Sequence, residues 1–83
     1  MSNAPDVALE TEILEALRRA GEPVREAALY ERVIAAGLDA TPEHFLAATA
    51  RLETLGHLHL SFDHETPAHD PEPFEPRYLR VIF

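Results

Sequence analysis

The side chains in this sequence with the clearest capacity for metal or acid–base chemistry are four histidines in its C-terminal half. They lie in or beside a segment rich in carboxylates, and they are His57, His59, His64 and His69. Imidazole and carboxylate groups are suitable ligands for zinc or another divalent ion. Their spacing matches no specific metal motif, so the simpler interpretation is a polar strand face followed by a solvated loop. We keep these residues as candidate ligands and predict neither a bound metal nor another cofactor.

Nucleophilic catalysis has little support in the sequence. Ser61 and His59 share one face of an expected strand, an arrangement that alternation alone often produces, and no oxyanion site accompanies them. The sequence has no cysteine, which excludes disulfides, thiolate ligands and a cysteine nucleophile. Its three glycines each lie at the end of an expected element, so no glycine-rich phosphate loop is present. We therefore predict no catalytic residue, no enzyme activity and no small-molecule substrate.

The balance of charge disfavours general DNA binding. Fifteen acidic residues face seven Arg and no Lys, and the formal net charge is −8. The resulting field repels phosphate at long range, although a local basic patch can still bind nucleic acid. The candidate patch consists of four arginines that are expected near one another: Arg25, Arg51, Arg77 and Arg80. They form either such a patch or, as the charge count favours, ion pairs with the abundant carboxylates.

Length and composition indicate one small domain. A chain of 83 residues has room for a single domain with a modest core. No apolar run is long enough for a transmembrane helix, and no basic segment followed by an apolar stretch predicts a signal peptide. We therefore expect a cytoplasmic protein without membrane contact. Residues 1–5 are expected to be a disordered tail or tag remnant, and residues 6–83 the domain.

Three segments have the periodicity of amphipathic helices. Asp6 is expected to cap the first, which ends at Gly21. The second runs from about Glu26 to Ala36. The third begins at the N-cap Thr41, with a proline at its first position, and ends at Gly56. The expected buried stripes are Leu9, Ile13, Ala16, Leu17 and Ala20, then Leu29, Val33 and Ala36, then Phe45, Ala48, Thr49, Leu52 and Leu55.

Two strands with an acidic loop between them follow the helices. Leu58, Leu60 and Phe62 alternate with polar residues, which is typical of a half-buried strand. Residues 63–76 contain four prolines and predict a long loop. The acids of this loop are Asp63, Glu65, Asp70, Glu72 and Glu75. Residues 78–83 are expected to form the second strand, with Leu79, Val81 and Phe83 on one face and Tyr78, Arg80 and Ile82 on the other.

The order of these elements resembles that of the winged helix-turn-helix superfamily. The residues that carry the resemblance are Glu22-Pro23-Val24, expected as a short extended link, the spacing of Ala28-Leu29 with Val33, and residues 51–58. The last segment contains the Leu-x-x-Leu-Gly pattern with which the third helix of that superfamily commonly ends. The resemblance implies an α+β fold, a three-helix winged helix-turn-helix with a C-terminal two-stranded β-hairpin whose long acidic loop is the wing.

Two functions remain open for such a fold. In members that bind DNA, the third helix typically enters the major groove and the wing touches the minor groove or the backbone. Residues that would serve a DNA-binding transcriptional regulator are Arg25, His44, Arg51, Thr54 and Arg77. The acidic wing opposes that role, so we favour a non-enzymatic recognition module for protein–protein interaction or homodimerisation. Its expected interface is Phe74, Tyr78, Arg80 and Ile82, unless the acidic loop folds back and covers Ile82.

Overall fold

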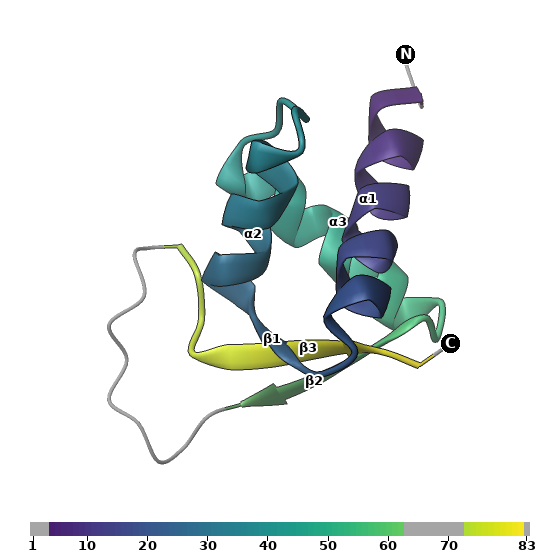
Figure 1. The fold of residues 1–83 in the computed structure, drawn as a ribbon, viewed down its shortest axis with the longest axis vertical. Coiled ribbons are helices and arrows are strands. Elements are labelled where there is room, and N and C mark those ends of the chain that lie inside the picture. The colour runs from purple at the N-terminus through teal and green to yellow at the C-terminus, as the bar shows by residue number, and fades with distance from the viewer. Residues whose placement is uncertain (1–3, 63–72, 83) are drawn as a thin grey trace.

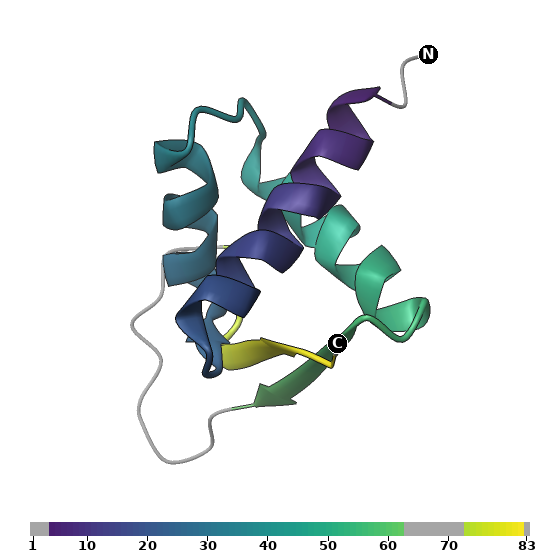
Figure 2. The same cartoon turned by 45° about the vertical axis from the view of Figure 1, so that its right-hand side comes forward.

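The computed structural model of this chain describes residues 4–62 and 73–82, in which three helices lie on one side of a small antiparallel sheet (Figure 1). The fold is α+β, as the sequence predicts. Helix α1 packs against both α2 and α3 and runs between them in Figure 2. In chain order the elements are α1 (Ala4–Ala20), β1 (Val24–Arg25), α2 (Glu26–Ala35), α3 (Pro42–Thr54), β2 (Leu58–Phe62) and β3 (Arg77–Val81).

The sheet has three strands in the order β1-β3-β2, so the prediction of a two-stranded hairpin was wrong by one strand. The expected extended link before α2 supplies the third strand, in which Val24 pairs with Leu79 and Arg25 with Tyr78. A strand of two residues is too short to display the alternation by which strands are recognised in a sequence. Strand β3 is consequently central, and its edges are covered by β1 on one side and β2 on the other.

The helix boundaries follow the predicted signals closely, with shifts at some ends. The predicted cap of α3 is confirmed, since the Thr41 hydroxyl accepts the backbone N–H of His44 at 3.1 Å. Helix α1 begins at Ala4, two residues before the expected cap Asp6, so residues 4–5 belong to the helix rather than to the tail. Helix α2 ends at Ala35, one residue earlier than expected.

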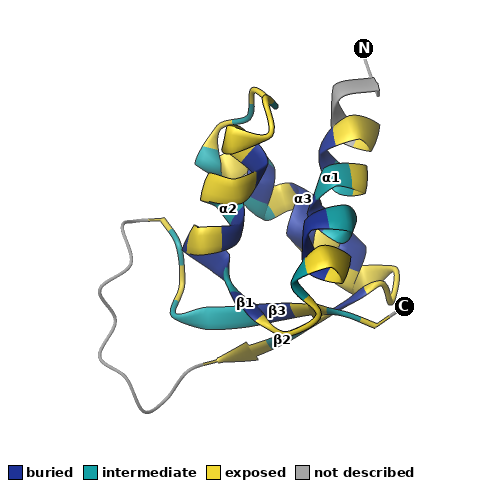
Figure 3. Cartoon of the chain, in the orientation of Figure 1, coloured by how far each residue is buried: buried dark blue, intermediate teal, exposed yellow. Residues whose placement is uncertain are grey.

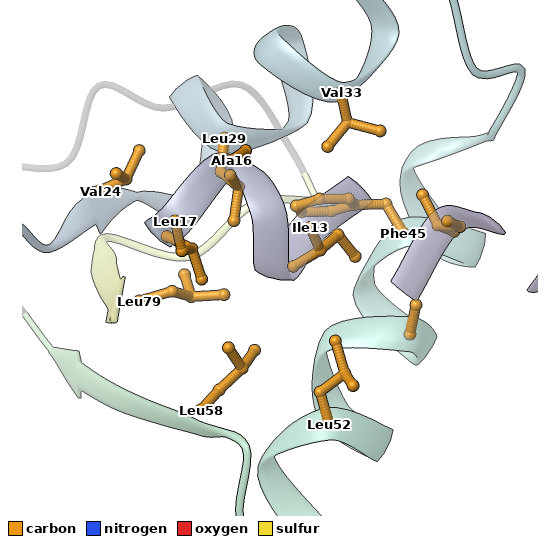
Figure 4. Packing of buried hydrophobic residues seen from close by; sticks show 12 residues of the cluster. Ile13, Ala16, Leu17, Val24, Leu29, Val33, Phe45, Leu52, Leu58 and Leu79 are labelled. Carbon is orange, nitrogen blue, oxygen red and sulfur yellow. The ribbon is translucent and has the colours of Figure 1, made fainter. Parts of the chain in front are cut away.

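The core lies where the three helices meet the inner face of the sheet (Figure 4). Most residues of the predicted stripes are buried there, but three expected core residues are exposed. Ala36 and Leu55 are the C-caps of α2 and α3, where each chain leaves its helix and its side chain is no longer held over the core. Phe62 is 52% exposed and is the last residue of β2. The burial colours of Figure 3 show this end of the strand as exposed and the helix faces that meet the sheet as buried.

Candidate functional site

The outward face of α3 is nearly neutral and built from small side chains. Glu43, Ala47, Ala50 and Thr54 are exposed along it, and His44 is half-buried. These positions agree with those expected for a reading helix. However, they offer few hydrogen-bond donors of the kind that read base edges or phosphates. Any contact between a positive charge of α3 and a phosphate must therefore come mainly from the single arginine of this helix.

That arginine, Arg51, is already engaged by a carboxylate of α1. Its Nε lies 3.0 Å from a carboxylate oxygen of Glu10, although the Arg51 side chain is 67% exposed. The pair ties the C-terminal half of α3 to α1. The Glu10 side chain is only 17% exposed, but Arg51 lies mostly in solvent, so the pair contributes about 1 kcal/mol. Its main consequence is electrostatic, because a phosphate that approaches Arg51 also meets the carboxylate of Glu10.

A second predicted reader, Arg77, is withdrawn from the surface. Its Nε donates to Glu26 Oε2 at 2.7 Å, and the two side chains are 18% and 0% exposed. The other carboxylate oxygen of Glu26 accepts the backbone N–H of Glu75 at 2.9 Å. Both oxygens of this buried carboxylate are thus satisfied, as a buried charge requires. The group is structural, because it fixes the start of α2 to the chain entering β3.

The outer face of the sheet gathers the remaining predicted residues. Strand alternation places Tyr78, Arg80 and Ile82 on this face, as expected. Arg25 joins them from β1, and its guanidinium donates to the Tyr78 hydroxyl at 3.2 Å and lies 5.4 Å from the centre of the tyrosine ring. Arg80 and Ile82 are exposed, whereas Tyr78 is half-buried. The four predicted arginines therefore do not form one basic patch: two are ion-paired with carboxylates elsewhere.

Phe74, predicted as part of an outer interface, instead closes the core. Its ring centre lies 5.2 Å from that of Tyr30 and 6.1 Å from that of Phe45. Tyr30 in turn contacts Phe45 edge to face at 5.3 Å and donates its hydroxyl to the carbonyl of Ala40 at 2.7 Å. Phe74 is half-buried and does not lie on the outer face of the sheet, because the segment before β3 turns inward toward α2 and α3, which alternation along β3 alone does not indicate. Its part in an interface stays a prediction.

The histidine candidates do not converge within the described residues. His57 and His59 are exposed at the start of β2, and His64 and His69 lie outside the described residues. No group of three or more His, Cys, Asp or Glu side chains suited to a metal ion occurs in the described part of the chain. His59 and Ser61 are both exposed on the same strand.

Helix α1 borders hollows on two of its sides in the described part of the chain. One, of about 320 Å³, lies between the end of α1 and β3, and another, of about 360 Å³, lies between α1 and α2. The first is lined by Leu17, Arg18, Gly21, Glu22, Pro23, Arg80 and Val81. Both hollows are partly open to solvent.

No protein-family model matches the sequence, and no curated protein or solved structure matches it either. Within the described residues, no helix combines the length and the apolarity that crossing a membrane requires. Functional inference therefore depends on the surfaces themselves, because a fold alone does not determine a function.

Proposed function

We propose that this chain is a winged helix domain that acts as a recognition module for protein rather than for nucleic acid. The topology supports the first part. A short strand lies between α1 and α2 in the chain and pairs with β3 in the sheet, and α3 passes directly into β2. Residues 63–72, which include most of the acidic wing, lie outside the described residues, so the proposal rests on the helices and the three strands.

The observation that carries the second part is the pairing of Arg51 with Glu10. Arg51 is the only Arg or Lys of α3, and its guanidinium lies against a carboxylate at 3.0 Å. Glu43 and Glu53, both exposed on the same helix, leave α3 with more carboxylates than cations. Affinity for a duplex depends on several phosphate contacts, each of which releases counterions. Helix α3 has one cation, which is already paired with a carboxylate, and the chain has a net charge of −8, so the helix supplies too few phosphate contacts.

Titration of a fluorescently labelled mixed-sequence duplex at low salt tests this proposal. We expect the anisotropy to show no saturable binding up to about 100 μM protein, the weak end of ordinary non-specific affinities. Arg51→Ala should give the same flat titration. The matched variant Glu10→Gln releases Arg51 from its ion pair, and it should also fail to bind, since one freed cation is insufficient.

A micromolar dissociation constant that weakens steeply with salt and is lost in Arg51→Ala would overturn the proposal. Binding gained only in Glu10→Gln would show that the ion pair alone keeps α3 from phosphate, which also contradicts it. Circular dichroism of each variant should match the wild type, because the Arg51 side chain is exposed and Glu10→Gln keeps the size of the partly covered Glu10 side chain.

A further inference from the structure

The outer edge of β2 presents backbone groups that are not used by the sheet. Ile82 donates its backbone N–H to the carbonyl of His57 at 2.9 Å, which makes these residues a hydrogen-bonded antiparallel pair. Bonded and non-bonded pairs alternate along a ladder. Leu58 and Leu60 therefore belong to non-bonded pairs and direct their N–H and C=O groups away from β3. Among the described residues, no strand lies on that side of β2 (Figure 1).

Strand β2 also lacks the features that usually protect an edge. Natural edge strands carry charged side chains, proline or a bulge, whereas β2 reads Leu-His-Leu-Ser-Phe and pairs with β3 in unbroken register. On the face toward the helices, Leu58 is buried, Leu60 is half-buried and Phe62 is mostly exposed. The helices therefore do not cover the C-terminal end of this apolar stripe, where the Arg77 guanidinium lies 5.8 Å from the centre of the Phe62 ring and leaves that side chain 52% exposed.

We propose that β2 pairs with β2 of a second copy of this chain, in an antiparallel ladder centred on Leu60, so that two three-stranded sheets become one of six strands. The inference rests on the proposed protein-recognition function and names its partner. A two-fold axis at Leu60 places it opposite Leu60 of the partner subunit, and places Leu58 opposite Phe62 of the partner subunit. The backbone N–H and C=O groups of these residues point away from β3. In the ladder, those of Leu58 and Leu60 therefore gain hydrogen-bond partners in the partner subunit.

This register is the one that uses the whole strand. Leu60 is the middle residue of β2, so an axis there opposes all five of its residues, whereas an axis at His59 or Ser61 also aligns outward-directed backbone groups but leaves part of β2 unpaired within the strand. The edge of β1 is a poor alternative, since it has two residues and follows Pro23, which has no N–H to donate. Only β2 thus offers a symmetric edge long enough for an isologous interface in the described part of the sheet.

Charge is also compatible with a second copy at this edge. Two chains of net charge −8 repel each other, and any face that carries carboxylates meets a like-charged face. Strand β2 contains no Asp, Glu, Lys or Arg. On the inner face Leu60 opposes Leu60 of the partner subunit, and Leu58 opposes Phe62 of the partner subunit at both ends of the ladder. On the outer face His59 opposes Ser61 of the partner subunit, also twice by symmetry, so no pair opposes like charges. The side chains of β2 itself therefore carry no charge that would repel an equally acidic copy, and the cation nearest to its end, Arg77 over the Phe62 ring, is already paired with Glu26.

Analytical ultracentrifugation of the full chain tests the pairing. The mass should rise from 9.3 kDa toward twice that value as the concentration increases from about 10 μM to about 1 mM, because dimerisation follows mass action. Phe62→Lys places a charge in the ladder. Because a lysine on an edge strand disfavours pairing with another chain, this variant should raise the dimer dissociation constant at least tenfold. Ile34→Lys makes the same change at an exposed apolar position of α2 and should leave the dimer unaltered.

A backbone variant and an exchange measurement keep the test independent of side-chain effects. Leu60→Pro removes an N–H that points away from β3, a change that edge strands tolerate, and it should abolish the dimer while circular dichroism stays that of a folded chain. Hydrogen exchange of the Leu60 amide should slow as concentration rises. Exchange of the Glu43 amide, in the first turn of α3, should not change, since it lies outside the ladder.

A chain that remains monomeric at the highest concentration, with rapid exchange at Leu60, would overturn the pairing. So would a dimer that survives both Phe62→Lys and Leu60→Pro. The duplex titration separates this failure from failure of the proposed function: a monomer that ignores DNA contradicts self-pairing alone, whereas a monomer that binds DNA in a salt-sensitive way contradicts both.

Discussion

Glu26 illustrates how much of this fold is held by contacts that are distant in sequence. It is fully buried at the first turn of α2, where the helix dipole favours a carboxylate. Its two oxygens accept from residues 49 and 51 positions away, the N–H of Glu75 and the Nε of Arg77. In the sequence it is an ordinary acidic residue at a helix start. Its burial could not be predicted, because no local pattern specifies which distant arginine will reach it.

Removal of the Glu26 carboxylate should be strongly destabilising. Glu26→Ala leaves Arg77 buried without its counter-charge, and breaking such a pair costs about 3 kcal/mol, at the low end of the usual range since Arg77 keeps some exposure. Urea denaturation followed by circular dichroism measures the loss. If the alanine variant does not fold, Glu26→Gln should fold with a smaller loss, because its amide oxygen can still accept the Glu75 N–H.

Glu31→Ala is the matched control for this change. Glu31 lies on the same helix but is exposed, so its removal should alter the free energy of unfolding by no more than about 0.5 kcal/mol. Equal losses for Glu26→Ala and Glu31→Ala would show that the buried ion pair contributes nothing specific to stability.

Among the elements, the turn from α3 into β2 determines how the edge strand is presented. Gly56, with φ of +86°, ends α3 in a Schellman motif. The His57 N–H donates to the Leu52 carbonyl at 2.9 Å, and the Gly56 N–H donates to the Glu53 carbonyl at 3.0 Å. These bonds fix the direction in which the chain leaves the helix, and they place Leu58 under the core.

Gly56→Ala should destabilise the domain by about 1–2 kcal/mol, the cost of holding a Cβ in the left-handed region. A Cβ built at Gly56 has no atom within 4 Å, so the loss would come from the backbone conformation and not from a clash. Thermal unfolding should show a decrease in Tm of several degrees, about 4–8 °C per kcal/mol for a domain of this size. Gly56→Asn should lose less, because Asn tolerates this region better; an alanine variant as stable as the wild type would contradict the argument.

Elements that are marked by neighbouring residues in the sequence were predicted. Elements that exist only because they pair with a distant part of the chain were not. The cap at Thr41, the glycine that ends α3 and the alternation of β2 each depend on neighbouring residues, which is why they were recognised. Strand β1 consists of two residues and exists only because β3 lies beside it. Likewise, Arg51 was recognised as exposed, but its pairing with Glu10 depends on how α1 crosses α3.

At the scale of the whole molecule, net charge and self-association oppose each other. A charge of −8 on 83 residues repels a second copy at distances beyond the interface. That repulsion is screened as the Debye length falls from about 10 Å at 0.1 M salt to about 3 Å at 1 M. The proposed β2 ladder contains no ion pair that salt could weaken. The ladder is held by backbone hydrogen bonds and apolar contacts, and these interactions depend little on screening by salt.

Salt should therefore strengthen the dimer, whereas it would weaken a complex with DNA. We expect the dimer dissociation constant, measured by ultracentrifugation, to decrease several-fold between about 0.05 M and about 0.5 M NaCl as the screening length shortens. The double variant Glu31→Gln/Glu43→Gln removes two exposed carboxylates outside the ladder. It should dimerise more tightly at low salt and respond less to added salt. A dissociation constant that increases with salt would mean that ion pairs hold the two copies together, and the charge-free edge of β2 could not then be the surface at which they meet.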